Sequence, residues 1–314
     1  MNKQFLSIEK AKPCVRILGI IQLVIGFSFL WLAPVEIYSF YLFSEGGPFY
    51  YDGFHIGSFI HGLVVAQILA FYAIGVLFII IGYGHIKLKT WTLNLSIGSI
   101  WFWIILGLPV MIFFLPLLSM KEINTQYPIL LLAGAAIILI IIVPVILLSF
   151  YYQINVKKLF TENADKVSEF KTMPADSYLA LIVYSLYILL FHIMIFYNGL
   201  FPLFGKFLTG HSGIFVYGFL IILMTLFIYG LFKRIRISWI ISVVFFGLLL
   251  ISATITILNY DFISIIELMN LPKLEHDIFV KLPLKSFYLL LPVSYILISS
   301  LIIVIRTGNY YKIK

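Results

Sequence analysis

The sequence predicts an all-α, polytopic membrane protein with eight transmembrane helices arranged as two parallel four-helix repeats. The chain is 62% hydrophobic and only 11% charged, with a mean hydropathy of +1.10. A soluble domain has too much surface to hide that many apolar side chains. The apolar residues gather in eight long runs, and the basic residues fall almost entirely in alternate gaps between them. Lipid is therefore the expected solvent for most of the chain.

The apolar runs predict helical spans. Nearly all of them reach the ~20 residues that a helix needs to cross a hydrocarbon core. Backbone polar groups in lipid must be paired within the segment or in a closed barrel, and long runs without alternation are typical of helices. The eight predicted spans cover residues 16–43, 54–83, 91–118, 128–152, 178–204, 213–232, 237–258 and 284–305.

The distribution of basic residues predicts the orientation. Of the 21 lysines and arginines, 16 lie in the two terminal segments and in the second, fourth and sixth gaps. The positive-inside rule then places both termini in the cytoplasm of a multi-pass cell-membrane protein. The first run is longer than a signal-peptide core, so it is expected to remain as a span. Orientation and anionic lipid explain the net charge of +8, and no nucleic-acid partner is needed.

An internal duplication is predicted from a shift of 156 residues. In that register HIGSFIHG (residues 55–62) falls on HSGIFVYG (residues 211–218). An even number of spans in each half implies parallel repeats related by an axis along the membrane normal. The predicted division is a first repeat over 1–155, a cytoplasmic linker over 156–177 and a second repeat over 178–314.

Two polar segments complete this organisation. Residues 153–177 are expected to continue the fourth helix into the cytoplasm and to stop before Pro174. Residues 259–283 begin with an amphipathic pattern and are expected to lie in the membrane interface. His85 and His276 lie in or beside polar gaps and are expected to be solvated. Cys14 is the only cysteine, so the chain has no internal disulfide and no cysteine-ligated cluster.

Four ionisable residues are the main candidates for a functional site. A charged group at membrane depth costs about 2.5–3.5 kcal/mol, so it points to function. In the 156-residue register, Glu36 falls on His192 and His55 falls on His211. Imidazole and carboxylate groups bind divalent transition metals and also transfer protons near neutral pH. These four residues are therefore predicted to face one substrate, ion or metal pathway, although no local metal-binding spacing supports a metal.

A simpler explanation competes with this site. A Glu or His near the interface can reach the headgroups or hydrogen-bond a neighbouring helix. Likewise, the many aromatic residues of the outer gaps are typical of the belt at lipid headgroups. Accessory polar candidates within or next to the spans are His61, Gln67 and Asn198.

The segment GHSG, residues 210–213, resembles in form the GxSG element of intramembrane serine proteases of the rhomboid type. The resemblance covers four residues and implies a serine nucleophile at Ser212. No histidine-bearing span follows Ser212, and a nucleophile needs a positioned base. The glycines are explained equally well as turn and close-packing positions.

The sequence favours a transporter or permease-like function, with a polar site in the outer half between the repeats, over an enzyme. The alternative is a non-catalytic membrane subunit whose aromatic outer surface docks a partner. A membrane redox protein with haem between His61 and His192 ranks third, and no cofactor motif supports it. The expected partners are the lipid bilayer, a small molecule or ion, and either a membrane protein or further copies of the chain.

The orientation can be tested by thiol labelling. In a Cys14→Ser background, cysteines introduced at Ser44 and Thr209 should react with impermeant reagents from outside the cell. A cysteine at Asn163 should react only after the membrane is permeabilised, since the basic residues assign that gap to the cytoplasm. Labelling of the Asn163 position from outside would overturn the eight-span topology.

Overall fold

Eight membrane-length helical segments make up most of the part of the chain that the structure describes. The computed structural model describes residues 7–50, 58–118, 126–162, 173–281 and 284–311. It is nearly all helical, and eight of its helical segments are long and apolar enough to cross a membrane, as predicted. Seven of these spans are formed by α1 (Ile8–Phe43), α2 (Phe59–Ile86), α3 (Thr90–Leu118), α7 (Ala175–Phe196), α8 (Gly210–Lys233), α9 (Arg236–Leu258) and α12 (Ser286–Arg306).

The remaining span, the fourth along the chain, is composite. It consists of α4 (Gln126–Ile137), the π-helical segment η2 (Ile138–Ile142) and α5 (Val143–Tyr151). Pro144 is the second residue after η2, and a proline removes one backbone donor from the helical ladder. The short elements are α6 (Ile154–Glu162), β1 (Phe201–Leu203), β2 (Lys206–Leu208), α10 (Phe262–Leu268), α11 (Lys273–Lys281) and α13 (Gly308–Tyr311).

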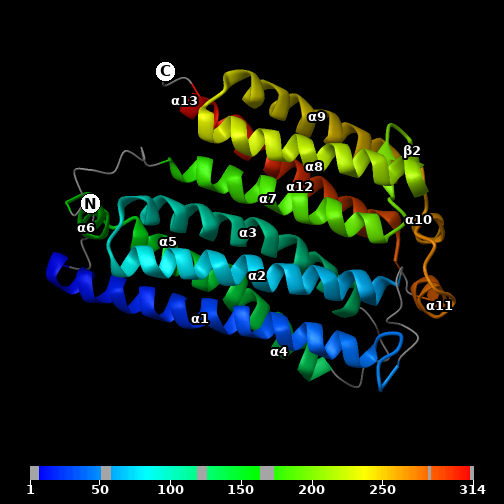
Figure 1. The fold of residues 1–314 in the computed structure, drawn as a ribbon, viewed down its shortest axis with the longest axis horizontal. Coiled ribbons are helices and arrows are strands. Elements are labelled where there is room, and N and C mark those ends of the chain that lie inside the picture. Colours follow the sequence, from blue (N-terminus) through cyan, green and yellow to red (C-terminus); the bar gives the residue numbers. More distant parts are fainter. Residues whose placement is uncertain (1–6, 51–57, 119–125, 163–172, 282–283, 312–314) are drawn as a thin grey trace.

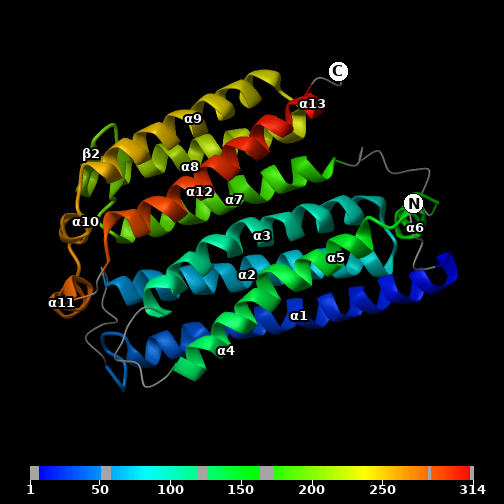
Figure 2. The same cartoon turned by 180° about the vertical axis from the view of Figure 1, so that it is seen from behind.

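The spans form two groups that are contiguous in sequence. Helices α1 to α5 lie together, and α7, α8, α9 and α12 lie together, in both views of the molecule (Figures 1 and 2). The groups meet where α3 contacts α7 and α12, and where α2 contacts α7. Both termini and α6 lie at one end of the bundle, called the terminal end below. The β-hairpin, α10 and α11 lie at the opposite end, called the distal end (Figure 1).

The outer surface of the bundle is apolar. Trp31 on α1, Leu131 on α4 and Phe215 on α8 are each at least 75% exposed. Similar exposed aliphatic and aromatic side chains occur on every span except α7. A soluble protein rarely leaves such large contiguous apolar surface in water. This surface therefore fits a lipid bilayer, which identifies the chain as an integral membrane protein.

Two pairs of glycines hold α1 and α2 in close contact. Gly19 and Gly26 on α1 face Gly82 and Gly75 on α2, and both pairs are seven residues apart along their helices. A Cβ added at Gly82 would lie 2.7 Å from the carbonyl oxygen of Gly19, and one at Gly26 would lie 2.9 Å from that of Gly75. Small residues let helices in lipid approach until their backbones touch. These four glycines, called the glycine seam below, join the first two spans.

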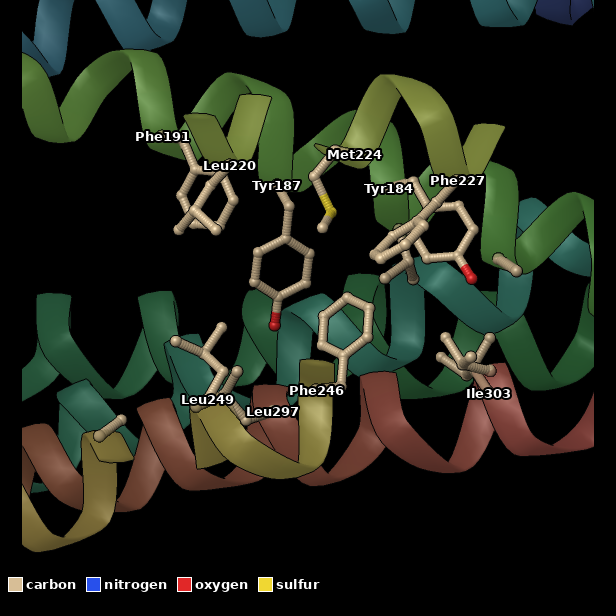
Figure 3. Close-up of a cluster of buried hydrophobic side chains, with 14 of the residues drawn as sticks. Tyr184, Tyr187, Phe191, Leu220, Met224, Phe227, Phe246, Leu249, Leu297 and Ile303 are labelled. Atoms are coloured by element: carbon tan, nitrogen blue, oxygen red, sulfur yellow. The ribbon is translucent and has the colours of Figure 1, made fainter. Parts of the chain in front are cut away.

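Aromatic side chains fill the core of the second group. Tyr187 on α7 points between the helices toward Phe246 on α9, and the ring centroids are 5.0 Å apart (Figure 3). The Tyr187 hydroxyl is hydrogen-bonded to Ser300 Oγ at 3.1 Å, and the Tyr184 hydroxyl donates to Ser242 Oγ at 3.2 Å. Buried hydroxyls in lipid need partners, and serines on α9 and α12 supply them. The cluster thus joins all four helices of the group.

The prediction that the fifth span continues to residue 204 is wrong. Helix α7 ends at Phe196, and Asn198 and Gly199 have φ of +55° and +59°. This left-handed backbone cannot extend a helix, and glycine adopts it at little cost. The chain instead forms a hairpin in which Phe201 pairs with Leu208. The hairpin is apolar enough to have been counted as part of the span.

The prediction that the fourth helix continues into the linker is also wrong. Helix α5 ends at Tyr151, and α6 starts at Ile154 in a new direction that brings it against α1 and α3. Val156, Leu159 and Phe160 of α6 are at most 3% exposed. Burial of this apolar face explains the turn. The rest of the linker, residues 163–172, lies outside the described residues.

The internal duplication stays a prediction. The same holds for the axis along the membrane normal and for the boundaries of the two repeats. Each group contains four spans, as the repeat requires. Local details differ between them, since the first group has the glycine seam and the second has the aromatic cluster.

The glycine seam predicts an unequal response to the same substitution. Gly82→Ala should destabilise the protein by about 1–3 kcal/mol, because the new methyl group meets backbone atoms that cannot rotate away. Gly218→Ala on α8 is the matched control, since nothing lies within 4 Å of its Cβ position. It should be neutral or stabilising by up to about 1 kcal/mol through helix propensity. Thermal unfolding in detergent measures both, and equal effects would contradict the seam.

Candidate functional site

Three of the four predicted site residues lie in the distal part of the bundle. Glu36 is half-buried on α1, and His192 is exposed on α7, where its Nδ1 lies 2.7 Å from the Ile188 carbonyl oxygen of the same helix. His211 is exposed at the start of α8. His55 lies outside the described residues. Within the part of the chain that the structure describes, no ion pair joins Glu36 to a histidine.

His61, predicted as an accessory residue, lies at the junction of both helical groups. Its side chain on α2 is 8% exposed. The ring lies between Phe40 of α1, at a centroid distance of 5.1 Å, and Phe196 of α7, at 5.3 Å. Spans from both groups therefore meet around one buried imidazole.

Glu36 and His192, the two main candidates, are each one helical turn from an aromatic residue of this junction. Glu36 precedes Phe40 by four residues on α1, and His192 precedes Phe196 by four residues on α7. Residues four apart lie on the same face of a helix, about 6 Å apart along its axis. Glu36 and His192 are thus each about one turn deeper in the bundle than the rings that flank His61. The sequence predicted that Glu36 and His192 lie at equivalent depth. In the structure, His61 of α2 contacts both of the helices that carry them, α1 and α7.

A buried carboxylate closes the distal end of α2. Glu275 of α11 is 5% exposed and accepts hydrogen bonds from the backbone N–H groups of Phe59 at 2.6 Å and Ile60 at 3.1 Å. Ser58 caps the same helix by accepting from the His61 N–H at 2.9 Å. A carboxylate at a helix N-terminus satisfies free donors and complements the positive end of the helix dipole. Glu275 thereby fixes α11 against the helix that carries His61.

Tyr197 adds a further contact at this position. Its hydroxyl donates to the Phe59 carbonyl oxygen at 3.0 Å. Burial, with a smaller contribution from the negative charge of Glu275, raises the pKa of Tyr197 to about 12. The tyrosine therefore stays protonated and remains a donor at physiological pH. Neither Glu275 nor Tyr197 was a candidate from the sequence, because each is more than 130 residues from Phe59.

His85 forms a second polar cluster, and the prediction that it is solvated is wrong. Its side chain is fully buried near the terminal end of α2. Nδ1 lies 2.7 Å from Gln22 Oε1 of α1, and Nε2 lies 2.9 Å from the Tyr151 hydroxyl of α5 and 3.4 Å from Ser96 Oγ of α3. The ring stacks on Tyr151 with an interplanar angle of 22°. One imidazole therefore joins four helices.

The hydrogen-bond partners define the form of this imidazole. An amide oxygen can only accept, so His85 Nδ1 donates to Gln22 and Nε2 accepts the Tyr151 O–H. Both ring nitrogens are then satisfied by a neutral ring. In the sequence, the only sign of this cluster was a histidine at the end of the second apolar run. Because His85 is followed by the basic residues Lys87 and Lys89, it was predicted to be exposed to solvent. Helix α6 covers the cluster, with Phe160 packing edge-on against the ring at 5.7 Å.

The remaining candidates have structural roles or face outward. Gln67 is exposed on α2, and Asn198 donates through Nδ2 to the Leu268 carbonyl oxygen at 3.0 Å. In the GHSG segment, Gly210 has φ of +60° and Gly213 packs against the backbone of Gly199. Turn and close-packing roles therefore account for these glycines.

Metal ligation receives no support from the described side chains. Among them, which do not include His55, no three His, Cys, Asp or Glu residues approach closely enough to hold a metal ion. The metal assignment for Glu36, His192 and His211 stays a prediction that depends on His55.

Comparisons with known proteins identify no relative. No family model matches the chain, and neither a curated protein nor a solved structure is similar to it. The fold and the site define the class, which is an integral membrane protein with eight candidate spans and one buried histidine near each end of α2.

The His85 cluster predicts different effects for two adjacent tyrosines. Tyr151→Phe should lower the free energy of unfolding by about 1 kcal/mol, because His85 Nε2 loses its nearest donor in a buried site. Tyr152→Phe is the matched control, since Tyr152 is 48% exposed and keeps its ring. Thermal unfolding in detergent distinguishes them, and equal stability of the two variants would contradict the hydrogen bond.

Proposed function

We propose that the protein is a transporter or permease-like protein of the cell membrane, with both termini in the cytoplasm. Its polar site lies in the outer, distal half of the bundle, where α1, α2 and α7 meet. The observation that carries the proposal is the burial of His61 between Phe40 of the first group and Phe196 of the second. A site formed by both groups changes when they move against each other.

The chemistry of the site suits an ion or a small polar solute. His61 supplies a titratable group at the junction, and Glu36 and His192 flank it about one turn deeper. A carboxylate and two imidazoles bind cations and exchange protons near neutral pH. Each residue costs free energy to insert in lipid unless water or a partner is present. A water-filled path from the distal end would offset this cost for Glu36, whereas His192 Nδ1 already lies 2.7 Å from the Ile188 carbonyl oxygen.

The surrounding contacts supply a means of closing the path. Glu275 and Tyr197 fasten α11 and the end of α7 to the first turn of α2. In the proposed mechanism these bonds hold the distal entrance closed, and their release opens it. The His85 cluster holds α1, α2, α3 and α5 as one body, against which the second group moves.

A second candidate function is a non-catalytic subunit that docks a membrane partner. It is favoured by the aromatic residues on the distal part of α1 and the loop after it. Tyr38, Tyr41 and Phe49 are each at least 59% exposed. Aromatic side chains with polar tips are enriched both at headgroups and at protein interfaces.

Cysteine accessibility tests the water-filled path. In a Cys14→Ser background, Glu36→Cys should react with a charged methanethiosulfonate added from outside. Ile37→Cys is the matched control, because Ile37 is adjacent on α1 and 46% exposed on the apolar surface. Thiols in lipid do not ionise readily and react slowly. Equal, slow labelling of both variants would leave the site without water and favour the docking subunit.

Transport itself can be measured in proteoliposomes on a supported membrane. Jumps of pH and of mono- and divalent cations should evoke currents in the unmodified protein. His61→Ala should reduce them by about tenfold or more, as expected when one hydrogen bond to a charged group is lost. His276→Ala in α11 serves as the control, since its side chain is 35% exposed at the distal end. Unchanged currents in His61→Ala would contradict the assigned site.

A further inference from the structure

A basic hollow lies at the terminal end of the bundle, remote from the distal site. It has a volume of about 390 Å³ and lies between the first turns of α1 and the C-terminal end of α2. Its walls comprise three cationic and three aliphatic side chains. These are Lys12, Arg16, Lys87, Ile20, Ile86 and Leu88.

The positive charges converge from two helices. Lys12, Arg16 and Ile20 are spaced four residues apart and share one face of α1. Lys87 is the C-cap residue of α2. Within the described part of the chain, no carboxylate forms an ion pair with any of these three cations. Orientation in the membrane requires basic residues at one end of the bundle, but it does not require three of them to line one hollow.

The charge balance favours an anion in the hollow. Three like charges around one space repel one another, and this repulsion is relieved by a bound anion. The C-terminus of α2 contributes about half a negative charge, far less than the three cations. Arg16 can bind a phosphate through two parallel hydrogen bonds, and the lysines act as point charges.

The aliphatic walls indicate which anion fits. Ile20 is 54% exposed and continues into the apolar outer surface of α1 through Val24, which is 61% exposed. A ligand in the hollow therefore has cationic groups on one side and a path along lipid-facing side chains on the other. An inorganic anion would use only the charges, whereas a lipid uses both parts.

The geometry points to a binding site for the phosphate headgroup of an anionic membrane lipid, formed by Lys12, Arg16 and Lys87. The acyl chains of that lipid lie along Ile20 and the outer face of α1. The glycine seam holds this site together, because Gly19 packs against Gly82 and Ile86 and thereby fixes the spacing of the two helix ends. The site is independent of the transport proposal.

Binding can be measured with the full-length protein in a neutral detergent. The probe is phosphatidylglycerol, titrated by native mass spectrometry, with phosphatidylcholine as the zwitterionic comparison. Each basic residue near an anionic surface contributes enough for about a fivefold change in affinity. Lys12→Gln, Arg16→Gln and Lys87→Gln should each weaken phosphatidylglycerol binding by about that factor, and the triple variant by about a hundredfold.

Two controls separate local binding from general charge and from misfolding. Lys157→Gln with Lys158→Gln removes two exposed charges from α6, and this pair should leave binding unchanged. Lys12→Arg with Lys87→Arg keeps the charge and should retain binding. If the triple Gln variant does not fold, the single variants and this charge-conserving pair still decide the result.

The outcomes are distinct. Selective binding of phosphatidylglycerol that is lost in the hollow variants, with no competition from millimolar inorganic phosphate, supports the lipid site. Displacement by inorganic phosphate, without selectivity between the two lipids, would assign the hollow to a free phosphate and overturn the lipid assignment. Equal weakening by the α6 control pair would show a diffuse charge effect and would also overturn it.

Discussion

The close approach of α1 and α2 at the glycine seam is the constraint on which the rest of the first group depends. Lipid provides no hydrophobic force between helices, so association depends on close packing and on hydrogen bonds. Gly19 and Gly82 bring the two backbones together, and the added Cβ distances show that no larger residue fits without movement. One turn away, Gln22 then reaches His85 at 2.7 Å. A wider helix pair would break this hydrogen bond between Gln22 Oε1 and His85 Nδ1.

The two helical groups hold their four helices together with different side chains. The first joins four helices through one imidazole, whose partners are Gln22, Ser96 and Tyr151. The second joins four helices through aromatic and aliphatic side chains (Figure 3). The hydroxyls of Tyr184 and Tyr187 in this cluster are hydrogen-bonded to Ser242 and Ser300. In each case a polar atom inside the bundle finds its partner on another helix. Such bonds fix which helices are neighbours and at what rotation.

At the distal end, the contact between the two helical groups includes polar side chains. His61 lies between aromatic rings from α1 and α7, and α11 is held to α2 by the buried Glu275. A carboxylate on a short surface helix holds a transmembrane helix terminus, so the distal loops belong to the packing of the bundle. The proposed path and its closure therefore meet at the first turn of α2, which carries His61 and is held by Glu275.

The sequence by itself determined the eight spans, because each needs only its own length of apolar residues to be stable in lipid. It also identified Glu36, His61 and His192 as costly polar groups in or near the spans. Only the tertiary structure decided which helices surround them. His85 appeared to be solvated because neighbouring residues in sequence are basic, whereas its real neighbours lie on α1, α3 and α5. Hydrophobicity acts locally along the chain, but hydrogen bonds and glycine contacts such as those of Glu275 and Gly82 join residues far apart in it.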